Sequence, residues 1–228
     1  MKKYVALLLA VLMVASLCAC GQKDKGSDLQ TVTKGKLTMS TNAQFPPYES
    51  VADDGKGYEG TGFEGIDIEI AYALAQKLGL ELVVDDMDFD SALSAVQTGK
   101  SDIVAAGVTV TPERQNTMCF TDSYANGVQV VIVKEGSDIN SIDDLEGKKI
   151  GTQRGTTGFI YCSDDYGDDN VIGFDDGATA VQNLLAGKVD CVVIDNVPAQ
   201  EYVKANAGMP TRTTPSVWPR TTPRCRKR

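Results

Sequence analysis

Short apolar strands alternate with amphipathic helices along most of this chain, and this alternation restricts the possible folds more than any other feature. The candidates in the first half are, in order, a strand at 36–40, a helix from Ile66 to Leu78, a strand at 82–84, a helix at 91–97 and a buried strand at 103–108. Gly79 can end the first helix, and Asp90 can cap the second. Because helices in such a pattern connect parallel strands and cover them, the first half predicts an α/β unit with parallel strands.

The same kind of pattern starts again after residue 125, which indicates a second unit. Its candidates are, in order, a strand at 128–133, a capped turn of helix at 141–145, a strand at 149–151, a Gly/Thr turn at 155–158, a helix at 179–185 and a strand at 191–194. Two α/β units of similar size predict two lobes, 35–125 and 126–208, with a cleft between them. Ligands of such sheets bind beyond the carboxyl ends of the strands, so we expect a binding site there.

Residues 1–19 have the pattern of a secretory signal peptide. Two lysines precede an apolar run from Val5 to Leu17, which is too short to cross a bilayer as a mature helix. The sequence Leu17-Cys18-Ala19-Cys20 resembles a bacterial lipobox, with cleavage before Cys20 and lipid on its thiol. Cys18 is the poorer acceptor because Leu17 would then occupy a position that requires a small residue. The alternative is an ordinary cleaved signal with incidental cysteines.

The polar segment 20–34 predicts a flexible linker between the lipid anchor and the lobes. These features together predict an extracytoplasmic protein that a lipid anchor holds at the bacterial cell membrane.

The composition excludes several kinds of chemistry. The chain has no histidine, which excludes a Ser-His-Asp triad and a histidine-ligated zinc. Cys119, Cys162 and Cys191 are unevenly spaced and form no CxxC pair, so we expect no metal site. The formal net charge of −9 argues against nucleic acid as a partner. We therefore expect no cofactor, no metal and no catalytic residue.

The last segment, 209–228, differs from the rest of the chain. It contains six basic residues, no acidic residue and four of the eight prolines, and it has no helical or alternating apolar period. We expect this Thr/Pro/Arg-rich tail to lack regular structure. One hypothesis is a frameshift near residue 209, because one choice of codons for 213–227 gives an acidic, helix-prone sequence in another frame. Re-reading the DNA tests it, and the alternative is a basic tail that binds anionic lipid or wall polymer.

Two charged residues are suited to a zwitterion. Arg114 follows a threonine-rich turn that begins at Thr109, and Asp195 ends an apolar strand. A free α-amino acid has a carboxylate and an ammonium a few ångström apart, so a guanidinium facing a carboxylate is the minimal device for holding it. Taken alone, the alternatives are a surface pair of Arg114 with Glu113 and a helix cap at Asp195.

Eight segments in order carry a family resemblance. They are 41–49, 65–69, 87–90, 97–102, 107–114, 120–124, 151–158 and 187–195. Over residues 36–208 they resemble the extracellular solute-binding proteins of family 3, the receptors of polar amino-acid ABC importers. The resemblance implies a monomer with the two-lobed periplasmic-binding-protein-like (type II) α/β fold. Because members of this family finish with a strand and helices on the first lobe, it also implies that the C-terminal part of lobe 1 is missing here.

The resemblance implies a role for each site residue. Arg114 would bind the ligand's α-carboxylate with two hydrogen bonds, and Asp195 would accept from its α-ammonium. Two phenylalanines would form aromatic walls, although plain core is the alternative for them, and an asparagine would reach the ligand's distal end. The ligand-binding residues predicted in this way are Asn42, Phe45, Phe89, Ala106, Gly107, Thr109, Arg114, Thr156, Thr157 and Asp195.

The function that follows is an extracytoplasmic receptor that closes on a polar amino acid and delivers it to the permease of an ABC importer. Gln153 and Arg154, near the second Gly/Thr turn, point to a polar or acidic ligand side chain, unless they face water. One alternative on the same fold is a cyclohexadienyl dehydratase-like enzyme that acts on prephenate-like acids. Another is a non-functional truncated fragment.

Overall fold

The computed structural model describes residues 29–206 and the backbone of residues 211–214. Within these residues, none of the helices combines the length and the apolar character that crossing a membrane requires. The predicted signal peptide, most of the linker and most of the tail lie outside the described residues.

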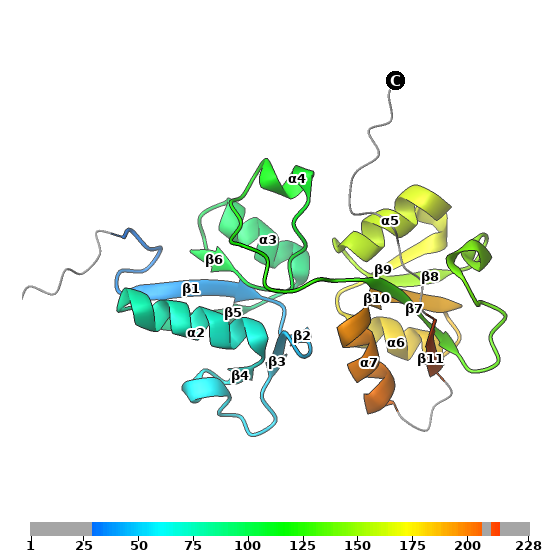
Figure 1. Ribbon diagram of the computed structural model, residues 1–228, viewed down its shortest axis with the longest axis horizontal. Helices are drawn as coiled ribbons and strands as arrows, with labels where there is room; N and C mark the ends of the chain where they lie inside the picture. The colour runs from blue at the N-terminus through cyan, green and yellow to red at the C-terminus, as the bar shows by residue number, and fades with distance from the viewer. Residues whose placement is uncertain (1–28, 207–210, 215–228) are drawn as a thin grey trace, which may run out of the picture. The chain divides into compact units, whose positions relative to one another are not determined.

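The N-terminal sheet has three parallel strands in the order β5-β1-β6 (Figure 1). They are β1 (Lys36–Thr41), β5 (Glu81–Asp86) and β6 (Ile103–Val104). Helix α2 (Ile66–Leu78) precedes β5, and helix α3 (Phe89–Gln97) connects β5 to β6. Gly79 ends α2 with φ 71°, in the left-handed region that glycine tolerates best. Met39 and Ile68 are fully buried where α2 packs on β1.

Two details of this half differ from the sequence-based expectation. The strand predicted at 103–108 stops at Val104 because the chain turns at Gly107, where φ is 55° and the N–H donates to the Asp67 carboxylate over 2.8 Å. The helix predicted to follow an Asp90 cap begins at Phe89 instead. Asp88 is at its N-cap position, and Asp90 lies in its first turn.

A small antiparallel sheet inserts between β1 and α2. It has the order β2-β3-β4, with β2 (Gln44–Phe45), β3 (Glu49–Val51) and β4 (Phe63–Glu64), and a short 3-10 turn η1 (Tyr58–Gly60) precedes β4. The β2–β3 turn contains the cis peptide bond Pro46–Pro47, and its register pairs Phe45 with Glu49. This pairing places Glu49 directly beside Phe45.

The C-terminal sheet has five strands in the order β11-β7-β10-β8-β9. They are β7 (Gln129–Lys134), β8 (Ile150–Gln153), β9 (Val171–Phe174), β10 (Cys191–Asp195) and β11 (Thr211–Thr214). The helices are α5 (Thr157–Tyr166), α6 (Gly177–Leu185) and α7 (Asn196–Ala205), with 3-10 turns η2 (Ile142–Leu145) and η3 (Asp168–Asn170). Strands β8, β9 and β10 are parallel, whereas β7 runs antiparallel to β10, so the arrangement predicted for the first half is only partly repeated in the second.

Strand β11 corrects the expectation of no regular structure for residues Thr211–Thr214, while the rest of the segment 209–228 lies outside the described residues. Residues Thr211–Thr214 pair with β7 in antiparallel register. The other edge of β7 pairs with β10, so without β11 its outer N–H and C=O groups would form an open sheet edge. An extended segment satisfies those groups by its backbone alone, without an apolar pattern of its own. The frameshift hypothesis is not tested by this pairing.

The β2–β3 turn also packs against the C-terminal half. Phe45 and Tyr48, whose rings stack with centroids 5.9 Å apart, belong to the same apolar cluster as Ile132, Val192 and Ile194. The hydroxyl of Tyr202 in α7 donates to the Gln44 C=O over 2.5 Å. These contacts join residues on either side of the chain segment that leads into β7.

Candidate functional site

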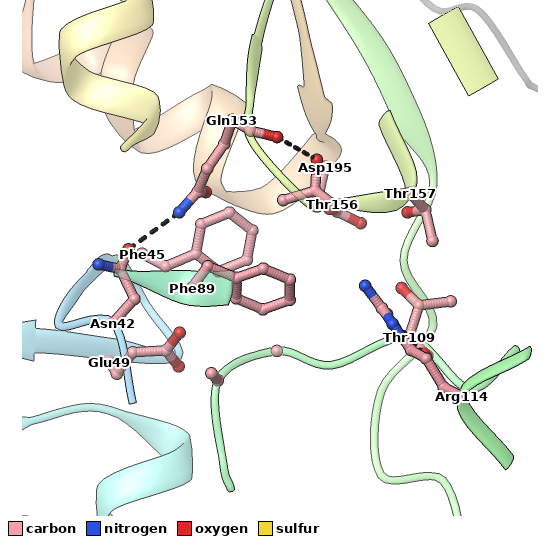
Figure 2. A pocket seen from close by; sticks show the side chains of 12 residues that line it. Asn42, Phe45, Glu49, Phe89, Thr109, Arg114, Gln153, Thr156, Thr157 and Asp195 are labelled. Carbon is pink, nitrogen blue, oxygen red and sulfur yellow. Dashed lines mark hydrogen bonds between the residues drawn. The ribbon is translucent and has the colours of Figure 1, made fainter. Parts of the chain in front are cut away.

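A pocket lies beyond the carboxyl ends of β1, β8 and β10, close to the ends of both main sheets (Figure 2). The residues that line it are Asn42, Phe45, Glu49, Phe89, Ala106, Gly107, Thr109, Arg114, Gln153, Thr156, Thr157 and Asp195. All ten residues that the sequence predicted for ligand binding are among them. Glu49 and Gln153 are the two that the prediction did not include.

Arg114 is fixed by a very short helix. Helix α4 (Pro112–Gln115) starts after Thr111, whose hydroxyl accepts from the Arg114 N–H over 3.2 Å, and the proline stands at its first position. The guanidinium donates to the C=O of Thr109 over 2.8 Å and to the C=O of Gly155 over 3.0 Å. Its central carbon lies 5.5 Å from the centre of the Phe89 ring. The side chain is therefore held from both halves of the chain.

The environment of Arg114 is that of a buried cation. The residue is 8% exposed, and burial lowers the pKa of its guanidinium. The ion pairs formed within the described residues do not include Arg114, so the alternative of a surface pair with Glu113 is not what the structure shows. A buried guanidinium that donates to two carbonyl groups and forms no ion pair among the described residues can still bind an anion strongly.

Asp195 takes the N-cap position of α7, but its side chain does not cap the helix. The carboxyl group lines the pocket instead, and a Cβ at Gly127 would collide with its Oδ1, which shows how closely the backbone approaches. Burial raises the pKa of Asp195, whereas a hydrogen bond from Gln129 and the charge of Arg114 oppose this shift. A cation placed next to Asp195 would stabilise its ionised form.

The two threonines at the start of α5 are used differently. The Thr156 hydroxyl caps the helix by accepting from the Phe159 N–H over 3.3 Å and donates to the Gln153 C=O over 2.7 Å. The Thr157 hydroxyl is buried and accepts from the Gln129 amide over 3.4 Å. Because the first N–H groups of a helix have no partner within it, this helix start is suited to a carboxylate.

Asn42 and Gln153 connect the two halves at the other end of the pocket. The Gln153 amide donates to Asn42 Oδ1 over 2.9 Å and to the Asp175 C=O over 3.3 Å. The Asn42 amide donates to the Met87 C=O over 3.0 Å. Arg154, by contrast, turns away from the pocket, since its guanidinium lies 3.5 Å from Asp175 and is half exposed. Of the two residues that suggested a polar ligand, only Gln153 lines the site.

Glu49 is the most informative residue that the sequence analysis missed. It is 1% exposed, and its Oε2 has no hydrogen-bond partner among the described residues. Burial raises the pKa of Glu49 well above its ordinary value, and the negative charge of Asp67 adds to the shift. Figure 2 shows Glu49 and Arg114 at opposite ends of the pocket, with the rings of Phe45 and Phe89 between them in this view. The signal in the sequence was the Pro-Pro turn, which pairs Glu49 with Phe45.

The predicted lipid acceptor Cys20 lies outside the described residues. The ligand-binding roles of the ten predicted residues stay predictions.

Comparisons with known proteins agree with this architecture. Residues 37–185 match the family model of the bacterial extracellular solute-binding proteins, family 3. The chain is 35% identical to the arginine-binding extracellular protein ArtP of Bacillus subtilis, over 90% of this chain and 78% of ArtP. It is 35% identical to a probable histidine-binding protein of Neisseria gonorrhoeae, over 90% of this chain and 76% of that protein. Among solved structures, an ancestral arginine-binding protein bound to glutamine is similar with a TM-score of 0.73 and 39% identity, covering 80% and 79% of the two chains.

Proposed function

The chain belongs to the bacterial extracellular solute-binding proteins of family 3, the amino-acid receptors of ABC importers, and on that premise we propose that its ligand is an amino acid with a cationic side chain. Homology supports the receptor function over the enzyme alternative, since the relatives are binding proteins. The pocket supplies the argument for the class of ligand.

The end of the pocket near Arg114 fits the α-amino and α-carboxylate groups. The guanidinium would bind the carboxylate with two hydrogen bonds, and the N–H groups at the start of α5, with the hydroxyl of Thr157, would add to them. Asp195 would accept from the α-ammonium. Thr109 and the backbone at Ala106 and Gly107 complete this end of the site from the N-terminal half.

The single observation that carries the proposal is Oε2 of Glu49, at the opposite end of the pocket, which is buried and receives no hydrogen bond from the described residues. A buried ionised carboxylate is costly unless a cation or several donors accompany it, and neither is present among the described residues. Phe45 and Phe89 offer apolar ring faces between the two charged ends, which suit an aliphatic stem or a flat guanidinium. An extended zwitterion with a distal cation matches this order of groups, and an acidic amino acid does not.

The relatives give independent support. ArtP is named for arginine, and the Neisseria protein for histidine. The ancestral arginine-binding protein was solved with glutamine, so that protein also accepts a neutral side chain. We therefore propose that the charge of Glu49 sets the preference for a cation, while the pocket walls accept more than one polar side chain.

Isothermal titration calorimetry with arginine, lysine, citrulline, glutamine and glutamate tests the proposal. Citrulline has the shape of arginine without its charge, so the loss of one charge-assisted hydrogen bond of about 1.5–3 kcal/mol predicts roughly 10- to 100-fold weaker binding than arginine. In Glu49→Gln the difference between arginine and citrulline should shrink to a few-fold. Equal affinities of the parent protein for the two ligands, or tightest binding of glutamate, would contradict the proposal.

We also propose that residues 35–125 and 126–208 form two lobes that close on the ligand, so that a permease recognises the closed receptor, and that Cys20 carries the lipid anchor. A ligand favours closure only through its own contacts that are absent in the open form, and Arg114 and Asp195, which line the pocket from the two halves of the chain, would supply such contacts. Mass spectrometry of arginine and prephenate after incubation with the protein should recover both unchanged. Conversion of either would support the enzyme alternative.

A further inference from the structure

We infer that Glu49 and Asp67 hold a single proton between them when no cation is bound, and that a cationic ligand side chain displaces this proton into solvent. Asp67 is then a specificity-determining residue that does not line the pocket but acts through Glu49. The inference rests on the proposed function and adds that binding of a cationic amino acid is coupled to proton release.

The two carboxyl groups are neighbours in a dry environment. Glu49 is in β3 and Asp67 in the first turn of α2, and both are almost fully buried, at 1% and 0% exposure. The Asp67 N–H donates to the C=O of Tyr48, the residue before Glu49, over 2.9 Å, which brings the two side chains close enough for a hydrogen bond between their carboxyl groups. Two ionised carboxylates repel, so such a bond forms only when a proton lies between them. With both groups ionised, none of the described donors reaches Oε2 of Glu49.

The hydrogen bonds around the pair assign the proton to Glu49. The Tyr124 hydroxyl donates to Oδ1 of Asp67 over 2.6 Å, and the Gly107 N–H donates to Oδ2 over 2.8 Å. Both donors stabilise the ionised form of Asp67, whereas none of the described residues donates to Oε2 of Glu49. Burial raises the pKa of both carboxyl groups, but only for Asp67 do hydrogen bonds oppose the shift. The ligand-facing member of the pair is therefore the one that exchanges its proton.

The other groups around the pair do not supply a counter-charge. Burial raises the pKa of Tyr48 and of Tyr202, and the negative charge of Glu49 adds to both shifts. Asp195 is a further negative charge near Tyr48. Among the described residues, no lysine or arginine side chain forms an ion pair with Glu49 or Asp67. Only a proton or a ligand cation can then balance the second negative charge, and the two compete for the same place.

Calorimetry in two buffers of different ionisation enthalpy measures the protons released, because the observed enthalpy changes in proportion to their number. For arginine we expect release of about half a proton per ligand at the pH where half of the free pairs hold the proton, and release that approaches one proton at lower pH. The affinity for arginine should fall as the pH drops from 8 to 5. Citrulline has the same α-ammonium and α-carboxylate groups as arginine, so the protons that it releases measure the exchange at Asp195 alone. Its release should be near zero, and its affinity should not change with pH in this range.

Two variants and a control separate a proton-holding role from a merely structural one. Asp67→Asn leaves one carboxyl group, so arginine binding should release little or no proton. Tyr124→Phe removes a donor to ionised Asp67, so the midpoint of release should move to higher pH while the protein stays folded. Asp138→Asn, at an exposed residue that pairs with Lys148 over 2.9 Å, is the matched control and should release as many protons as the parent.

The outcomes distinguish this inference from the proposed function. Tight arginine binding with the same enthalpy in both buffers from pH 5 to 8 would overturn the shared proton and leave the proposed function intact. Release from citrulline equal to that from arginine would assign the proton to Asp195 and also overturn it. Failure of arginine to bind at any pH would overturn both.

Discussion

Replacing Arg114 with alanine should reduce ligand affinity far more than it reduces stability. In the structure the guanidinium is buried and makes two hydrogen bonds to the C=O groups of Thr109 and Gly155. A ligand carboxylate bound beside this guanidinium would accept two charge-assisted hydrogen bonds from it, of about 1.5–3 kcal/mol each. Their loss totals about 3–6 kcal/mol, which corresponds to roughly 10²- to 10⁴-fold in Kd.

The control for this experiment is the neighbouring exposed arginine. Arg154→Ala removes a cation that contacts Asp175 and does not line the pocket, so the affinity should stay within about three-fold of the parent. Arg114→Lys keeps the charge but loses the planar fork, and an intermediate affinity is expected. Calorimetry with arginine measures all three, and circular dichroism checks the fold. If Arg114→Ala bound arginine as tightly as the parent, the carboxylate would not lie at Arg114 and the orientation of the ligand would be wrong.

Three further predictions concern stability and closure. Burial raises the pKa of Glu49, so its contribution to stability is fully present below the ordinary carboxyl pKa of 4.5 and is lost as the pH rises through its folded value. Glu49→Gln should therefore raise the Tm more at pH 8 than at pH 4.5 in calorimetric scans without ligand, and a larger gain at acid pH would contradict the assignment. Gly155 has φ 73°, and a Cβ there would meet the Asp90 carboxyl group, so Gly155→Ala should weaken arginine binding about ten-fold through about 1–2 kcal/mol of backbone strain; an unchanged Kd would show that this turn adapts freely. Gly65 has φ 122°, and a Cβ there would overlap the backbone of Tyr48, so Gly65→Ala should lower the free energy of unfolding in urea by about 2 kcal/mol or more. A loss below about 0.5 kcal/mol would mean that the α2 start and the β2–β3 turn are not tightly joined.

Local patterns predicted the elements whose ends depend on nearby residues. Helix α2 was predictable because its apolar residues recur at helical spacing and Gly79 ends it. The strand predicted at 103–108 was too long because the partner of the Gly107 N–H, Asp67, lies far away in the sequence. Strand β11 could not be predicted from its own residues, since its only role in pairing is to complete the edge of β7.

In the candidate site, too, the features set by nearby residues were predictable and those set by residues distant in the sequence were not. Arg114 and Asp195 were predictable because each ends a recognisable segment and their charges are complementary. Glu49 required the register of the β2–β3 turn, which places it beside Phe45, and its unusual state required knowledge of Asp67 and Tyr124. Gln153 was noticed in the sequence, but its bond to Asn42 comes from the meeting of two halves that are distant in the chain.

The hydroxyl of Tyr202 donates to the Gln44 C=O, and Phe45 and Tyr48 share an apolar cluster with residues of the C-terminal sheet, so these contacts join the two halves directly. If the two lobes close as proposed, such contacts favour the closed form with or without bound ligand, and they lower the free energy of closure that the ligand itself must supply. They would then also set a background population of closed, empty molecules that compete with loaded ones for the proposed permease. Selection on this small patch would therefore adjust uptake at low nutrient concentration against futile docking, while the residues that choose the nutrient stay unaltered.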